Sequence, residues 1–146
     1  MLRKLPFAIA VLVVAAALSG QPARADALAD AVAVIPAGVE EVRFAGSWTE
    51  GDQGGTYRII VLRSSAKPVT ARLFVQWIAL GGDGARVARS VEIAEFAALK
   101  ADIADFFTEA DADGLAVHIE SAGSDGAGYE LFITGPNDYR FGRASN

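Results

Sequence analysis

Four acidic residues between positions 109 and 120 have the spacing of a calcium-binding loop. They occupy the first, third, fifth and twelfth positions of the segment, and a glycine occupies the sixth: Glu109, Asp111, Asp113, Glu120 and Gly114. EF-hand loops use this spacing because calcium takes about six to eight oxygen ligands. Residues 115–120 alternate in polarity like a β-strand, however, and this pattern favours an Asp-Gly turn that leads into a strand. A turn without a cofactor is the preferred interpretation, and a calcium site is the alternative.

His118 is the single histidine of the chain. On a strand over residues 115–120 it faces away from the apolar side chains, so we expect it at the surface. A metal site would need further ligands, and only Glu120 shares this face. Catalysis would need a nucleophile within hydrogen-bond reach, and the sequence contains no GxSxG or comparable element. We therefore predict no catalytic residues; an enzyme that uses carboxylates and arginines is the alternative.

Large aromatic residues come from three successive predicted strands: Trp48, Tyr57, Phe74 and Trp77. If the sheet curls, we expect these rings on its concave side, where they either fill the core or line a pocket for a small apolar ligand. Arg89 alternates in phase with Val87 and Val91, and a charge on an apolar face must be paired or face a cavity. A β-bulge would explain its position equally well. The predicted ligand-binding residues are these four aromatic residues and Arg89.

The segment Gly46-Ser47-Trp48 is similar to the GxW signature that opens the barrel in lipocalins, avidins and some bacterial periplasmic inhibitors. The resemblance implies a tight bend at Gly46 and a tryptophan that plugs a barrel end. It covers these residues and the strand pattern, and no other motif of those families follows. In the same strand, Val42, Phe44, Gly46 and Trp48 are expected to share the apolar face.

The candidate residues are carried by strands that clear turn signals separate. Clusters of glycine with Asp or Asn reverse the chain at residues 51–55, 81–84, 113–114, 123–128 and 135–138. The runs between them alternate with a period of two, and short connections favour antiparallel pairing. We predict a mainly β (α+β) fold: an antiparallel meander of about seven strands curled into a half-barrel or sandwich.

One helix is predicted near residues 96–108, where the period changes. Phe96, Leu99, Ile103 and Phe106 recur at the three- and four-residue spacing of one helical stripe. Acidic residues lie on the opposite side of the same helical projection. A weaker helical pattern covers residues 27–34 and ends before Pro36.

Composition limits the class of protein. The 146 residues contain no cysteine and carry a formal net charge of −5. The length fits one domain, and the lack of thiols excludes disulfides, cysteine-ligated metal and thiol catalysis. An acidic chain is also a poor partner for nucleic acid.

Residues 1–25 have the pattern of a secretory signal peptide. Arg3 and Lys4 precede an apolar run over residues 7–18, and Ala23 and Ala25 are small enough for signal peptidase. The run is shorter than the roughly 20 residues that span a bilayer, so we expect no membrane anchor after cleavage. Residues 26–146 are then one β-rich domain in the periplasm or outside the cell.

These features predict an exported, non-enzymatic binding or protein-interaction module. Its partner would be a small apolar ligand or another periplasmic protein. The alternative is an acid- and arginine-based enzyme or a calcium-binding protein that uses residues 109–120.

Overall fold

The computed structural model describes residues 29–123, 126–136 and 138–145. The chain divides into two compact units, the first ending at Ile35 and the second beginning at Pro36. In the first unit residues 29–33 are helical. The predicted signal peptide, residues 1–25, lies outside the described residues. In the part of the chain that is described, no helix is long and apolar enough to cross a membrane.

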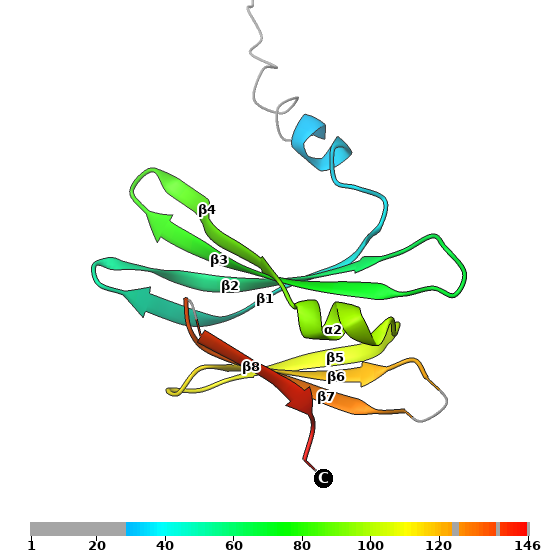
Figure 1. Cartoon of the computed structure of the whole chain (residues 1–146). Helices are drawn as coiled ribbons and strands as arrows, with labels where there is room; N and C mark the ends of the chain where they lie inside the picture. The colour runs from blue at the N-terminus through cyan, green and yellow to red at the C-terminus, as the bar shows by residue number, and fades with distance from the viewer. Residues whose placement is uncertain (1–28, 124–125, 137, 146) are drawn as a thin grey trace, which may run out of the picture. The chain divides into compact units, whose positions relative to one another are not determined.

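The second unit is mainly β, as the sequence predicts, and consists of two antiparallel sheets (Figure 1). The first sheet has the order β1-β2-β3-β4 and the second β5-β6-β7-β8, so each is a meander. The strands are β1 (Val39–Glu50), β2 (Gln53–Arg63), β3 (Ala71–Gly81), β4 (Gly84–Glu92), β5 (Ile103–Ala110), β6 (Leu115–Ser121), β7 (Gly128–Gly135) and β8 (Asp138–Arg143). A short helix, α2 (Ala94–Leu99), connects the two sheets. The described strands form a sandwich and not a closed barrel.

The two sheets share one hydrophobic core. Alternate residues of the central strands of each sheet face it, which is the pattern expected when one face of a sheet is covered. The fully buried side chains of the central strands include Ile59, Leu73, Val75, Val117 and Leu131. This core packs the two sheets against each other and so positions the ends of their strands.

The predicted helix over residues 96–108 is wrong beyond Leu99. Helix α2 ends at Lys100, which adopts the left-handed conformation with φ 51°, and β5 begins at Ile103. The pairing of β5 with β6 shifts between Ile103 and Asp105, so one extra residue separates the buried Ile103 from the buried Phe106. A β-bulge therefore reproduces the three-residue spacing of a helix. It also explains why the protein has eight strands and not about seven.

Helix α2 closes one end of the core through Phe96. This side chain is fully buried and meets Tyr129 and Phe141 edge to face, with ring centroids 6.5 and 6.2 Å apart. Edge-to-face contacts of this kind add to the energy of burial alone. The opposite end of the sandwich has no such plug.

A bulge also reverses the predicted apolar face of β1. Arg43 and Ala45 are the residues paired with the buried Ile59 and Tyr57, so they face inward, while Val42 and Phe44 are exposed on the outer face. The register shifts between Ala45 and Trp48, around Gly46 with φ +59°. A positive φ is easy for glycine, and the extra residue turns Trp48 inward.

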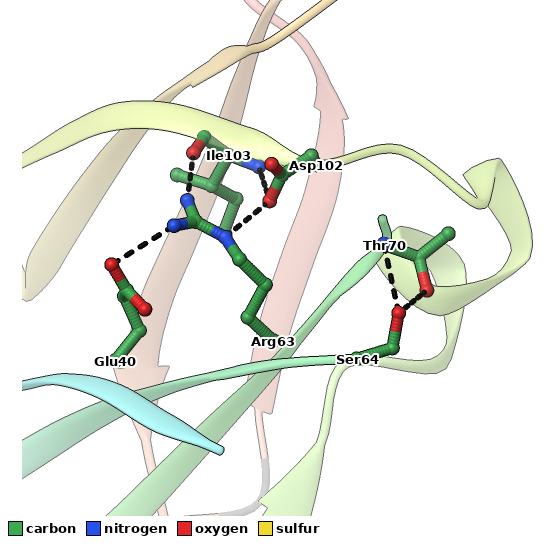
Figure 2. A network of polar contacts seen from close by, with 6 residues as sticks. All are labelled: Glu40, Arg63, Ser64, Thr70, Asp102 and Ile103. Atoms are coloured by element: carbon green, nitrogen blue, oxygen red, sulfur yellow. Dashed lines mark hydrogen bonds and ion pairs between the residues drawn. The ribbon is translucent and has the colours of Figure 1, made fainter. Parts of the chain in front are cut away.

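Arg63 ties the first sheet to the start of β5 (Figure 2). Its guanidinium donates to Asp102 Oδ1 and to the carbonyl of Ile103, both at 2.8 Å. It also forms an ion pair with Glu40 at 2.9 Å. Beside this network the Ser64 hydroxyl accepts from the backbone N–H of Thr70 at 3.0 Å.

Candidate ligand site at the hairpin end

Four of the six hairpin connections of the two described sheets lie at the end of the sandwich opposite α2, here called the hairpin end. The registers Glu50 with Gln53, Gly81 with Gly84 and Ala110 with Leu115 place three of these turns at corresponding ends of their sheets. The β7–β8 turn follows Gly135 on the same side. Within the described residues of the second unit the one helix, α2, lies at the other end, so side chains of the strands next to the turns close the core here.

Two tryptophans fill most of the core at the hairpin end. Trp48 on β1 is 6% exposed and Trp77 on β3 is 1% exposed. Tyr57 on β2 is buried next to them and meets Trp77 edge to face, with centroids 5.9 Å apart. Burial raises the pKa of Tyr57 above its ordinary value, because the phenolate would lose its hydration. The structure therefore brings together three of the four aromatic residues that the sequence singled out.

A pocket of about 370 Å³ opens beside these rings. It is lined by residues of β1 to β4 and by the β7–β8 turn: Trp48, Glu50, Gln53, Trp77, Arg86, Ala88, Arg89 and Pro136. This volume lies in the range of sites for small molecules. A second hollow, of about 250 Å³, lies where Trp48 and Tyr57 meet Asp111 and Asp113. The Trp48 indole thus borders both spaces.

Arg89 reaches the pocket because β4 contains a bulge. Trp77 pairs with Arg89 and the next residue, Ile78, pairs with Val87, so Ala88 is the extra residue. Arg89 therefore faces the Trp77 side of the sheet, whereas Val87 is exposed on the outer face. The guanidinium carbon lies 5.6 Å from the centroid of the Trp77 ring, a cation–π distance. The sequence placed Arg89 and Val87 on one face, and the bulge at Ala88 instead puts them on opposite faces, with Arg89 among the residues that line the pocket.

The two indole N–H groups differ in their partners. Trp48 Nε1 donates to the carbonyl of Thr56 at 3.2 Å. Trp77 Nε1 is buried, and no acceptor for it is found among the described residues. Buried polar groups nearly always have a partner, so an orphaned donor in a residue that lines a pocket is notable.

Phe74 does not lie with the other three aromatic residues, contrary to the expectation that all four share the concave side of the sheet. It alternates with the buried Leu73 and Val75, so it lies on the outer face of the first sheet. There the guanidinium of Arg72 lies 5.2 Å from its ring centroid. Alternation along β3 separates Phe74 from Trp77, because side chains three positions apart in a regular strand point to opposite faces.

The four predicted calcium ligands are not brought together. The hairpin register places Glu120 opposite Asp105, far along the strand from the turn, and Glu109 opposite Ala116. Asp111 Oδ1 instead accepts from the backbone N–H groups of Asp113 and Gly114, at 2.8 and 3.0 Å. Within the described ranges no group of three or more histidine, aspartate or glutamate side chains is placed to hold a metal ion. A tight hairpin cannot wrap around an ion as an EF-hand loop does.

His118 lies on the outer face of the second sheet, as its alternation predicts. Its ring stacks on Phe107 with centroids 4.5 Å apart, and its Nε2 lies 3.2 Å from Glu109 Oε2. A hollow of about 380 Å³ adjoins it, lined by Asp105, Glu120 and Tyr129 among others. Among the lining residues that the structure describes there is no serine or threonine.

Sequence reasoning missed Arg86, Gln53 and Pro136 as neighbours of Trp48 and Trp77. Arg86 Nη2 donates to Gln53 Oε1 at 3.1 Å, across the mouth of the pocket. The signal available for Arg86 was its position next to the Gly81–Gly84 turn, which returns β4 alongside β3. Comparison with known proteins finds no matching family model, no similar curated protein and no similar solved structure, so function is inferred from the pocket itself.

Proposed function

We propose that this protein is a non-enzymatic binding module that takes a small ligand at the hairpin end, into the pocket formed by Trp48, Trp77, Arg89 and their neighbours. One observation carries the proposal: a pocket of about 370 Å³ opens at the hairpin end, and its lining includes Trp48, Trp77 and two arginines, Arg86 and Arg89. Ligand sites combine apolar and aromatic walls with a few polar groups, and this lining has both.

The same proposal places the protein outside the cytoplasm. Its support is the pattern of residues 1–25, with a basic start, an apolar run and small residues before the cleavage point. A chain without cysteine is stable there through packing alone, and the shared core of the two sheets supplies that packing.

Binding can be tested with the neutral fluorophore N-phenyl-1-naphthylamine. The chain contains two tryptophans, and both line the pocket, so quenching of intrinsic fluorescence reports on this site directly. We expect saturable binding of the probe with quenching of tryptophan emission. Absence of binding up to the solubility limit of the probe, or binding without quenching, overturns the proposal.

A matched pair of variants locates the binding. Ala88→Phe adds a ring at the pocket, whereas Ala85→Phe makes the same exchange in the same strand at a position paired with Leu80 on the outer face. Both alanines are exposed, so both variants should fold, and thermal unfolding checks this. Ala88→Phe is expected to weaken probe binding at least tenfold, and Ala85→Phe is expected to leave it unchanged. Equal affinities of the two variants would place the probe elsewhere and overturn the proposal.

A further inference from the structure

The arginines of the first sheet differ in how their charges are balanced. Arg43, Arg63 and Arg72 form ion pairs with carboxylates, at 2.5, 2.8 and 2.5 Å. Arg86 and Arg89 both line the hairpin-end pocket, and neither has a carboxylate within ion-pair distance in the described part of the chain. Arg86 has an amide partner and Arg89 an aromatic ring. The pocket is therefore lined by two arginine side chains whose charges are not balanced by a carboxylate partner.

The pocket is also rich in donors. Arg86 and Arg89 present guanidinium N–H groups. Among the described lining residues Glu50 is the one carboxylate, so two positive charges face one negative charge. Asp111 and Asp113 line the separate hollow on the other side of Trp48. Cations without carboxylate partners are complementary to an acceptor-rich anion.

The remaining walls are flat or small. Trp48 borders the pocket, and Ala88 and Pro136 supply short apolar surfaces, whereas Trp77 is 1% exposed beneath the Arg89 guanidinium. A guanidinium can stack on a planar ring and bind an anionic group, so Arg89 suits an anion that carries an aromatic ring.

We infer that the ligand class of this pocket is a small aromatic monoanion, such as an aryl carboxylate or sulfonate, with Arg89 as the residue that selects for its charge. This inference rests on the proposed function, since it names the ligand of the same site. Arg89 binds the anionic group while the ring of the ligand lies against Trp48, Ala88 and Pro136.

Two probes with one scaffold separate charge selection from apolar binding. 1-Anilinonaphthalene-8-sulfonate carries the phenylnaphthylamine rings of the neutral probe together with a sulfonate. We expect the anionic probe to bind the wild-type protein more tightly than the neutral probe. Arg89→Gln should weaken the anionic probe about tenfold and change the affinity of the neutral probe less than twofold.

Arg58→Gln is the matched control. Arg58 also lies near an aromatic ring, 5.8 Å from the centroid of Phe44, and its side-chain partner is the amide of Gln76 and not a carboxylate. It lies on the outer face of the sheet, so its removal should leave both affinities unchanged. A loss of anionic-probe affinity in Arg58→Gln equal to that in Arg89→Gln overturns the inference.

The two proposals fail in different ways. If Ala88→Phe abolishes binding of the neutral probe but Arg89→Gln does not weaken the anionic one, the charge selection is wrong and the binding site stands. If Ala88→Phe affects neither probe, the site itself is wrong and both proposals fall.

Discussion

Trp77 combines a structural role with a place in the candidate pocket. It is 1% exposed and belongs to the shared core, while one part of its surface lines the space beneath Arg89. Its removal therefore has a cost in stability that is separate from any effect on binding. The size of that cost shows whether the ring of Trp77 acts mainly as part of the core or as the wall of an open site.

Trp77→Ala should lower the free energy of unfolding by about 3–5 kcal/mol, because a large buried ring leaves a cavity behind. Phe74→Ala, three residues away on the outer face, should cost roughly 1 kcal/mol, since its ring is not fully buried. Urea unfolding followed by far-UV circular dichroism gives both values. A loss below about 1 kcal/mol for Trp77→Ala would show that its ring stands at an open wall and contributes little to packing.

Because Tyr57 is buried, we expect the free energy of unfolding to fall at high pH. Burial raises its pKa in the folded state above the value of about 10 found in unfolded chains. Its contribution to stability is complete below pH 10 and is lost as the pH rises through the folded pKa, at most by about 1.4 kcal/mol per pH unit. The stability of Tyr57→Phe should fall less steeply between pH 9 and 11 than that of the wild type. Identical slopes in urea titrations across this range would contradict the prediction.

Alternation predicted part of the candidate site. It placed Trp48 and Trp77 on apolar faces, and both are buried at one end of the sandwich, but Trp48 faces inward through the bulge at Gly46, which alternation does not contain. The same alternation already places Phe74 on the face of β3 opposite to Trp77, away from the candidate site. What a single sequence could not show was the approach of Pro136, because the distance between two sheets depends on packing across the core.

At the scale of elements, the sequence predicted the strands and misread the places where their period breaks. Register shifts occur around Gly46, at Ala88 and between Ile103 and Asp105. A bulge is a property of two paired strands, so its position is not encoded in the periodicity of either one. The shift in β5 was read as a helix, and the shift in β1 inverted an apolar face.

The connection between the sheets depends on a few polar contacts at their edges. Arg63 is the centre of one such network, with Glu40, Asp102 and the carbonyl of Ile103 as acceptors (Figure 2). Arg43 makes a second link by donating to the carbonyl of Phe106 at 2.7 Å. These contacts hold β5 beside the first sheet after the chain has turned through α2.

Arg63→Gln should reduce the free energy of unfolding by about 1–2 kcal/mol, because hydrogen bonds to a charged group are lost and Asp102 keeps its charge. The value stays modest since the Arg63 side chain is 31% exposed. Arg72→Gln removes an exposed ion pair with Glu92 and should leave the unfolding midpoint unchanged. Equal midpoints for the two variants would mean that the network in Figure 2 does not stabilise the fold.

At the scale of the whole molecule, the proposed location outside the cytoplasm depends on residues that precede the first unit's described helix. If residues 1–25 are a signal peptide, the protein recovered from the periplasm or culture medium begins at Asp26. Intact-mass measurement of that material tests the assignment. A mass that includes residues 1–25 would contradict cleavage and restore the membrane-anchor alternative.

The extra residue in β4 also bears on how the molecule avoids sticking to itself. Strand β4 pairs with β3 alone and is exposed over most of its length, and such an edge invites pairing with another chain. Bulges and inward-facing charges are known to discourage this, and Ala88 and Arg89 supply one of each. Deletion of Ala88 would remove the bulge, so side chains along β4 would alternate regularly while Arg89 stays opposite Trp77. The edge formed by β4 would then be straight. We expect this variant to self-associate at concentrations where Ala88→Gly, which keeps the bulge, sediments as the wild type does. Equal sedimentation of both variants would show that the edge is protected by other means. Aggregation of the deletion variant alone would show that the bulge residue Ala88 prevents self-association of the protein.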